Sequence, residues 1–299
     1  MNPIVFPFPD DEPMAAALLP RLSAQAGRIE WHRFPDRESL ITLHGDCSNR
    51  DVILVCTLTD PDTKFLPLYF CAATARDLGA KRVGLIAPYL AYMRQDRRFR
   101  DGQSLSAHSF ARLLSSSFDW LVTVDPHLHR IASLDEIFTI PATAVSAMPA
   151  VSEWIAANVA SPVLIGPDRE SAQWAERVAR SLDAPSLILE KIRAGDCDVK
   201  VSAVDTGIVR GRRPIIVDDI ASSGHTLAEA LRGFAPLGIV DVTCIVVHAL
   251  FADGAVKMLR EAGARRIVST NTVPHATNTI DVAPSIAAQV RAYLVKTTP

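Results

Sequence analysis

The sequence lacks the features that mark secreted, membrane-embedded and nucleic-acid-binding proteins. Its five cysteines are scattered without a CxxC pair, which argues against a disulfide framework and a zinc site and favours small buried thiols. No segment has the ~18 uninterrupted apolar residues of a membrane span, and the N-terminus has no positive region followed by an apolar stretch. The 31 basic and 33 acidic residues nearly cancel, so no global field attracts nucleic acid or an anionic membrane. These absences predict a cytoplasmic protein in which any anion-binding site is local.

The 299 residues are 48% hydrophobic, which is enough for one large core or two of ordinary size. Short β-branched runs such as "DVILVCTL", "RVGLIAPYL", "WLVTVD", "SPVLIGPD" and "VTCIVVHAL" alternate with longer amphipathic stretches. Helices are expected over 65–78, 104–115, 169–182, 226–234 and 253–262. Near-continuous apolar strands followed by helices indicate parallel sheets covered on both faces. The predicted fold class is α/β, with parallel-rich sheets flanked by helices.

The region "IPATAVSAMPAV" carries prolines and small residues between two such series, and a domain boundary is expected there. We expect one domain over 1–143 and a second over 144–283. The tail "APSIAAQVRAYL" predicts a final helix, and residues 284–299 are expected to return to the first domain.

Polar residues collect where predicted strands end, which is where ligands bind in an open α/β sheet. They are Asp125 and His127 after "WLVTV", Asp168 after "VLIGP", Lys191 and Arg193 after "LILE", and Asp218 and Asp219 after "IIV".

The stretch "IIVDDIASSGHTL", residues 215–227, places two carboxylates side by side at the end of an apolar run. Their repulsion must be compensated by solvent, a metal ion or a polyhydroxyl ligand. The following "ASSGHT" supplies small side chains, backbone N–H groups and three hydroxyls directly before a predicted helix, which suits a phosphate monoester. A helix cap and turn would use the same residue types. Carboxylates beside a phosphate cradle favour a ribose phosphate as ligand.

This stretch resembles the phosphoribosyl-diphosphate motif shared by phosphoribosyltransferases and ribose-phosphate diphosphokinases. "APYLAYMRQDRRF" and "RFPDRESL" look like two further segments of the diphosphokinases. With "VDPH" and "EKIR" added, the resemblance runs along nearly the whole chain in that family's order. It implies two phosphoribosyltransferase-like domains, the first binding ATP and the second binding ribose 5-phosphate. The implied reaction moves the β,γ-diphosphate of ATP to the C1 hydroxyl of ribose 5-phosphate and releases AMP.

The resemblance also implies an ATP site shared between subunits of a homo-oligomer, either a dimer or a multiple of dimers. The matching loop around Phe34, Asp36, Arg37 and Glu38 would reach the adenine bound by the neighbouring subunit. The same site would receive Arg94, Gln95, Asp96 and His127 from the other chain. The charge pattern agrees, because "RQDRRFR" concentrates four arginines in an otherwise neutral protein.

Mg2+ is the implied cofactor, at positions matched by His127 and Asp168, with Asp125 assisting. Imidazole is not a preferred magnesium ligand, so His127 could instead contact the triphosphate. Lys191 and Arg193 match the catalytic loop. The ribose 5-phosphate site would comprise Arg193, Asp218, Asp219, Ser222, Ser223, Gly224, His225 and Thr226.

Three positions depart from the family pattern. Arg37 and His225 stand where glycine is usual, and Ser222 stands where many members have a third aspartate. Two other functions use part of the same pattern. One is a phosphoribosyltransferase, which needs no arginine-rich ATP loop; the other is a regulatory paralogue that binds nucleotides without turnover.

Overall fold

The computed structural model describes residues 1–167, 171–188, 191–194, 198–201, 206–234, 236 and 238–295. The chain forms two compact units, Met1–Ser146 with Val282–Pro299 and Ala147–Asp281. They are called unit 1 and unit 2 below. In the described part of the chain, no helix is long and apolar enough to cross a membrane.

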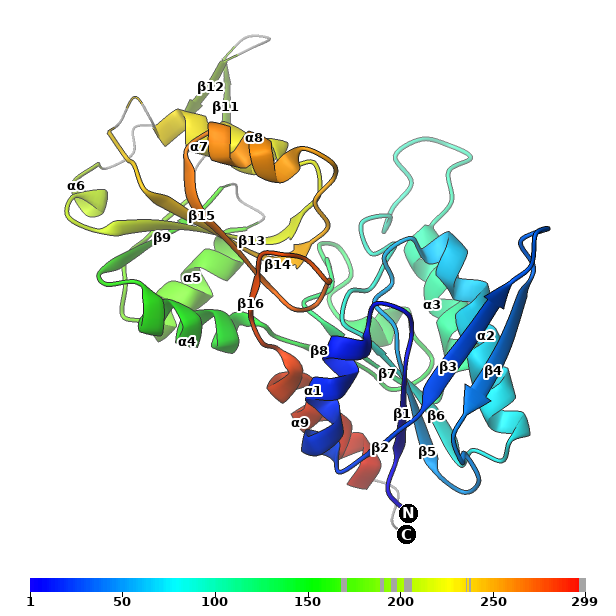
Figure 1. Ribbon diagram of the computed structural model, residues 1–299. Helices are drawn as coiled ribbons and strands as arrows, with labels where there is room; N and C mark the ends of the chain where they lie inside the picture. The colour runs from blue at the N-terminus through cyan, green and yellow to red at the C-terminus, as the bar shows by residue number, and fades with distance from the viewer. Residues whose placement is uncertain are drawn as a thin grey trace. The chain divides into compact units, whose positions relative to one another are not determined.

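Unit 1 is built on a six-stranded parallel sheet with strand order β2-β1-β5-β6-β7-β8. Figure 1 shows α2 and α3 on one face of this sheet and α1 and α9 on the other. The elements of unit 1 are β1 (Ile4–Pro7), α1 (Glu12–Leu22), β2 (Gln25–Ala26), β3 (Arg28–Arg33), β4 (Ser39–His44), β5 (Asp51–Val55), α2 (Pro61–Asp77), β6 (Arg82–Ala87), α3 (Ser106–Ser117), β7 (Trp120–Val124), η1 (Leu134–Glu136), β8 (Ala142–Val145) and α9 (Ala283–Val295).

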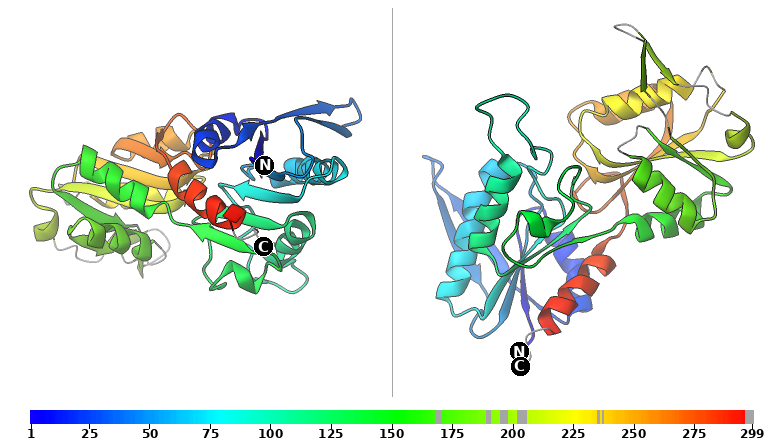
Figure 2. Two further views of the ribbon diagram at one scale, coloured as in Figure 1. Left: turned by 90° about the horizontal axis from the view of Figure 1, so that it is seen from below. Right: turned by 180° about the vertical axis from the view of Figure 1, so that it is seen from behind.

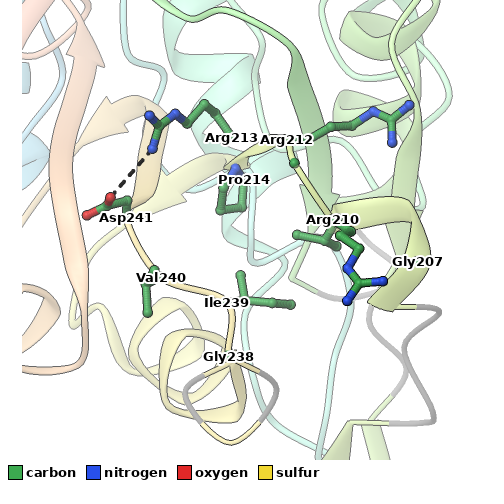
Figure 3. A pocket seen from close by; sticks show the side chains of 11 residues that line it. Gly207, Arg210, Arg212, Arg213, Pro214, Gly238, Ile239, Val240 and Asp241 are labelled. Carbon is green, nitrogen blue, oxygen red and sulfur yellow. Dashed lines mark ion pairs between the residues drawn. The ribbon is translucent and has the colours of Figure 1, made fainter.

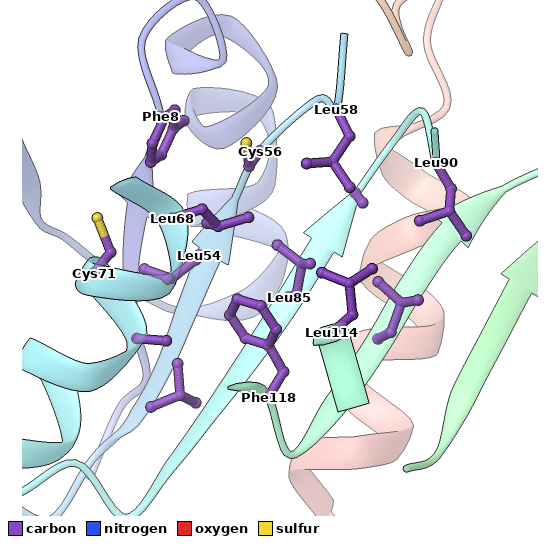
Figure 4. Close-up of a cluster of buried hydrophobic side chains, with 14 of the residues drawn as sticks. Phe8, Leu54, Cys56, Leu58, Leu68, Cys71, Leu85, Leu90, Leu114 and Phe118 are labelled. Atoms are coloured by element: carbon purple, nitrogen blue, oxygen red, sulfur yellow. The ribbon is translucent and has the colours of Figure 1, made fainter. Parts of the chain in front are cut away.

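The core of unit 1 lies between the sheet and helices α2 and α3. Leu54 and Leu85 from the sheet meet Leu68 of α2 and Leu114 of α3, and all four are buried (Figure 4).

The cysteines behave as small apolar side chains: Cys47, Cys56, Cys71 and Cys244 are free and buried, and Cys197 lies outside the described residues. Burial raises the pKa of the Cys71 thiol to about 12.

The C-terminal helix α9 packs on unit 1 through its tyrosine. The ring of Tyr293 stacks on that of Trp120 with 5.3 Å between centroids, and its hydroxyl lies 2.5 Å from Oγ1 of Thr143. Trp120 in turn covers Gly84 on the neighbouring strand, where a Cβ atom would come within 2.0 Å of the indole. Glycine at 84 therefore makes room for the aromatic pair that holds α9.

Unit 2 repeats this architecture with strand order β10-β9-β13-β14-β15-β16, again all parallel. Helices α7 and α8 cover one face, and α4 and α5 cover the other (Figures 1 and 2). The elements of unit 2 are α4 (Met148–Asn158), β9 (Pro162–Gly166), α5 (Ala172–Ser181), β10 (Ser186–Ile188), β11 (Lys191–Ala194), β12 (Asp198–Val201), α6 (Thr206–Val209), β13 (Arg213–Ala221), α7 (His225–Phe234), β14 (Val242–Ala249), α8 (Ala255–Glu261), β15 (Ala264–Thr270) and β16 (Asn278–Ile280).

Each unit carries an antiparallel hairpin at the same point of its topology. The hairpin β3–β4 follows β2 in unit 1, and β11–β12 follows β10 in unit 2. The α/β class with parallel-rich sheets is thus confirmed, and the two units share one strand order. The stretch "SLILEKI", expected as a single strand, instead contributes β10 and the start of β11.

The segment expected as a domain boundary contains a strand. Residues Ala142–Val145 form β8, and Thr143 pairs with Val122 of β7. Unit 1 therefore ends just after β8, at Ser146, and not inside it at 143. Proline and small residues are compatible with this because β8 lies at the edge of its sheet.

Candidate active site

Two loops of unit 1 emerge at the same edge of its sheet. Strand β6 ends at Ala87 and strand β7 at Val124, and the two strands pair in parallel. The loop over 88–105 carries Arg94, Gln95 and Asp96, and the loop after Val124 carries Asp125 and His127. The parallel sheet thus brings these sequence-predicted residues to one edge.

The first loop, residues 88–105, is called the arginine loop below and is held at Tyr92. Tyr92 has a positive φ of 67°, and its hydroxyl donates a hydrogen bond to Oδ1 of Asp62 at the start of α2. Its ring packs on Phe110 with 4.9 Å between centroids. The hydrogen bond to Asp62 raises the pKa of Tyr92 to about 12. The N–H of Gln95 donates to the Tyr92 carbonyl at 2.9 Å. The fixed tyrosine therefore positions the backbone of Arg94 and Gln95.

The exposed part of the arginine loop is strongly basic. Arg94, Arg97, Arg98 and Arg100 are exposed, against one exposed carboxylate, Asp101. The Gln103 side chain accepts hydrogen bonds from the N–H groups of residues 99 and 100, at 2.9 and 3.0 Å, which closes the end of the loop. Several guanidinium groups held on one short loop are suited to a polyphosphate.

Asp96 differs from its neighbours because it is buried. Both of its carboxylate oxygens accept from Nη1 of Arg130, at 3.0 and 3.2 Å, and its side chain is 2% exposed. Arg130 lies on the second loop, after His127. Sequence reasoning missed Arg130; its only signal was a basic residue close behind the "VDPH" strand end.

The second loop begins with a strained residue. Asp125 is buried and has a φ of 31°, a backbone region that few residues other than glycine adopt, and its N–H donates to Val145 at 3.0 Å. His127 is half-buried and lies edge-to-face with His129, with 3.8 Å between ring centroids.

The predicted adenine-contacting residues lie at the tip of hairpin β3–β4. The Phe34 N–H donates to the Glu38 carbonyl at 2.9 Å, and Oδ1 of Asp36 accepts from the Glu38 N–H at 3.1 Å. Phe34 is 41% exposed. The views in Figures 1 and 2 show this tip apart from the arginine loop of the same chain.

Arg37 occupies the position of the tip that needs glycine, since its φ is 74°. Replacing Arg37 by glycine should slow hydrogen exchange of the β3–β4 amides about two- to fivefold, because about 0.5–1 kcal/mol of backbone strain is released. The control is Arg37→Ala, which removes the charge and keeps the strain. Equal exchange in the glycine and alanine variants would contradict this account.

In unit 2, the acidic pair lies inside strand β13 and not beyond its end. The strand continues through Asp218 and Asp219 to Ala221, and Asp218, Ile220 and Ala221 are in register with β14. Asp219 is buried and Asp218 is half-buried, and the Asp219 N–H donates to Oδ1 of Asp218 at 3.0 Å. Because consecutive side chains of a strand point to opposite faces, the two carboxylates face opposite sides of the sheet.

The loop after β13 forms the N-terminus of helix α7. Gly224 has a φ of 75°, and its carbonyl accepts from the Ala228 N–H at 2.9 Å. The Ser222 carbonyl accepts from the Ala252 N–H at 3.0 Å, which ties the loop to the segment after β14. The left-handed residue is thus Gly224, while His225 is an exposed first helical residue without a positive φ. Histidine in place of the usual glycine therefore strains no backbone here.

Lys191 and Arg193 lie on β11, in register with Val201 and Val199 of β12, and β12 lies against α7. The hairpin therefore stands beside the helix that begins with His225. Asp168 lies outside the described residues. Within the described residues, no group of three or more His, Cys, Asp and Glu side chains could hold a metal ion.

A surface pocket lies at the opposite edge of the unit 2 sheet (Figure 3). It is lined by Arg213 and Pro214 at the start of β13 and by Asp241 just before β14, and Arg213 pairs with Asp241 at 3.5 Å. Because it lies at the amino ends of the strands, it is separate from the acidic pair and the Ser222–Thr226 loop.

Comparison with known proteins gives the family of this chain. The N-terminal domain of ribose phosphate pyrophosphokinase matches residues 4–117, and the phosphoribosyl transferase domain matches residues 133–285. Ribose-phosphate pyrophosphokinase from Saccharolobus solfataricus is 35% identical over 89% of this chain and 92% of its own length. The enzyme of the same description from Methanobrevibacter smithii is 30% identical over 93% and 96%. The chain belongs to the ribose-phosphate pyrophosphokinase family.

A solved structure supports the fold of this pyrophosphokinase family member. Phosphoribosylpyrophosphate synthetase from Mycobacterium smegmatis aligns over 99% of this chain and 100% of its own, with a TM-score of 0.84 and 24% sequence identity. The predicted family and the predicted phosphoribosyltransferase-like fold are both confirmed. The match of residues 4–117 to a domain specific to pyrophosphokinases disfavours a phosphoribosyltransferase.

Proposed function

We propose that this chain is a ribose-phosphate diphosphokinase that transfers the β,γ-diphosphate of ATP to the C1 hydroxyl of ribose 5-phosphate. The products are 5-phosphoribosyl 1-diphosphate and AMP. One observation carries the proposal: a single chain of this family has an acidic pair late in a strand, followed by a loop at a helix N-terminus, in one unit and an arginine loop in the other.

Unit 2 would bind ribose 5-phosphate. Asp218 and Asp219 would accept hydrogen bonds from the ribose hydroxyls, and the 5-phosphate would lie at the N-terminus of α7 against Ser222–Thr226. Helix α7 has ten residues, so its dipole and free N–H groups favour a dianion at this end.

Unit 1 would bind ATP. Arg94 and Gln95 are both exposed on the loop fixed by Tyr92 and would contact the triphosphate, together with His127. The half-buried imidazole of His127 is better suited to a phosphate oxygen than to Mg2+.

Mg2+ fits the donors of unit 2. It favours one or two carboxylates and completes its shell with water and substrate oxygens, so the half-buried carboxylate of Asp218 would be sufficient without a protein cage. Asp168 and Asp125 are proposed as further Mg2+ positions, as the family resemblance implies. When bound, the ion would neutralise charge on the phosphate oxygens.

In the proposed reaction, the C1 hydroxyl oxygen attacks the β-phosphorus of ATP and the bond from that phosphorus to the α,β-bridging oxygen breaks. AMP leaves with the electron pair of that bond, and the proton of the attacking hydroxyl passes to solvent. Lys191 and Arg193 on the β11–β12 hairpin would stabilise charge on the transferring group. The test is an assay of purified protein with ribose 5-phosphate, Mg2+ and ATP that follows AMP and the phosphorylated sugar. Nucleotide binding without AMP formation would favour a regulatory paralogue instead.

The proposed oligomer shares each ATP site between two chains. The exposed Phe34 ring and the separation of the hairpin tip from the arginine loop of its own chain both support this arrangement.

Mixing Glu38→Ala protein with Arg94→Ala protein should restore about a quarter of the unaltered activity, because half of randomly formed pairs are hybrids with one intact site of two. Glu38→Ala mixed with Asp36→Ala is the control and should restore nothing, since both changes lie on one hairpin. If native mass spectrometry shows free subunit exchange and activity stays absent in the first mixture, the shared site is wrong.

A further inference from the structure

The two loops at the edge of the unit 1 sheet are joined by an ion pair between a buried and a half-exposed side chain. Arg130 Nη1 donates to both oxygens of Asp96, and the side chains are 46% and 2% exposed. A carboxylate buried to this extent requires a cationic or hydrogen-bonding partner, because unpaired burial of the charge costs several kcal/mol. The position of Asp96 is therefore coupled to that of Arg130.

The pair lies directly beside the proposed ATP contacts. Asp96 follows Arg94 and Gln95 in the chain, and Arg130 follows His127. Directly before Asp96, the Gln95 carbonyl accepts from the Ala107 N–H at 3.3 Å, which ties the same segment to helix α3. A shift of the buried carboxylate would thus move the exposed Arg94 and Gln95 side chains with it.

We propose that Arg130 is a positioning residue for the ATP site, acting through Asp96 on Arg94 and Gln95. This inference rests on the proposed function. It assigns Asp96 to holding the loop, whereas the sequence pattern had placed it among the residues that contact ATP. Small displacements of the groups that bind a substrate weaken its binding. An ion pair that positions those groups can therefore control affinity without touching the substrate.

The test compares Arg130→Ala with Arg130→Lys. Arg130→Ala should raise the KM for ATP about 10-fold or more and weaken ATP binding in calorimetry by a similar factor, while the KM for ribose 5-phosphate stays unchanged. Arg130→Lys should recover part of the loss, since a lysine ammonium can still pair with Asp96. Circular dichroism of each variant checks that it is folded.

Arg76→Ala provides a matched control. Arg76 pairs with Asp119 at 3.0 Å in the same unit, and Asp119 precedes β7, at the edge of the sheet away from the arginine loop. This variant loses an ion pair of the same length, and its KM for ATP should be unchanged. An equal effect of Arg76→Ala and Arg130→Ala would overturn the proposal.

A double-mutant cycle separates positioning from direct contact. If Arg130 acts through the arginine loop, Arg130→Ala should have little further effect on ATP affinity in an Arg94→Ala background. Additive losses would show that Arg130 works independently of Arg94 and would overturn the proposal. Absence of AMP formation by the unaltered protein would contradict the proposed function, whereas the calorimetric cycle would still decide the role of Arg130.

Discussion

Replacing Lys191 by alanine should lower kcat about 100- to 1000-fold, the loss expected when one preorganised electrostatic group is removed. Lys191 lies on the β11–β12 hairpin, and β12 lies against the helix that starts at the proposed phosphate site. Its charge would act on the diphosphate during transfer more than on either bound substrate, so kcat should fall more than affinity changes.

Asp218→Asn is the matched comparison, because Asp218 would contact the ribose equally in ground state and transition state. This variant should chiefly raise the KM for ribose 5-phosphate. Rapid-quench measurement of AMP formation in a single turnover isolates the chemical step from product release and loop motion. An unchanged single-turnover rate in Lys191→Ala would show that Lys191 does not stabilise the transition state. An unchanged KM in Asp218→Asn would show that the acidic pair does not bind the ribose.

Asp11→Asn should make unit 1 more stable at neutral pH. Asp11 is buried directly before α1, and its carboxylate accepts from the N–H and Oγ1 of Thr57 at 2.8 and 2.6 Å. Desolvation raises its pKa to about 6, although the Thr57 hydrogen bonds and the charge of Lys64 oppose the rise and Glu12 adds to it. An asparagine keeps both hydrogen-bond partners without a buried charge.

The sign of the pH dependence follows from this raised pKa. The folded protein binds the proton more tightly than the unfolded chain, so the stability contribution of Asp11 is fully present below pH 3.8 and is lost as the pH rises through about 6. The pKa difference corresponds to about 3 kcal/mol. The variant and the unaltered protein should therefore be about equally stable near pH 4 and differ by about this amount at pH 7.5.

Urea unfolding followed by tryptophan fluorescence measures this difference. Phenylalanine in place of Trp154 and Trp174 removes the reporters of unit 2, leaving Trp31 and Trp120 in unit 1. Asp46→Asn is the control: Asp46 also accepts a backbone N–H, from Ser48 at 3.0 Å, but its side chain is 64% exposed. A stability difference for Asp11→Asn that does not change between pH 4 and 7.5 would refute the assignment.

The sequence predicts best those strands that are buried on both faces. The runs at Asp51–Val55, Trp120–Val124 and Val242–Ala249 are apolar because helices cover both sides of each sheet, so composition alone marks them. The hairpins β3–β4 and β11–β12 were not predicted. Arg28–Arg33 of β3 alternates exposed and half-buried residues and lacks that apolar signal. Pairing between strands outside the main sheets decides both hairpins.

The sequence by itself determined the α/β class, the family and the order of the motifs, because residue types, spacing and apolar runs are properties of the linear chain. Only the tertiary structure decided that Asp96 is buried on Arg130 and that Tyr92 is held by Asp62. These contacts join loops and helix ends that lie 30 or more residues apart, as for Tyr92 with Asp62. Such pairings depend on which strands become neighbours in the sheet, and local sequence does not encode that choice.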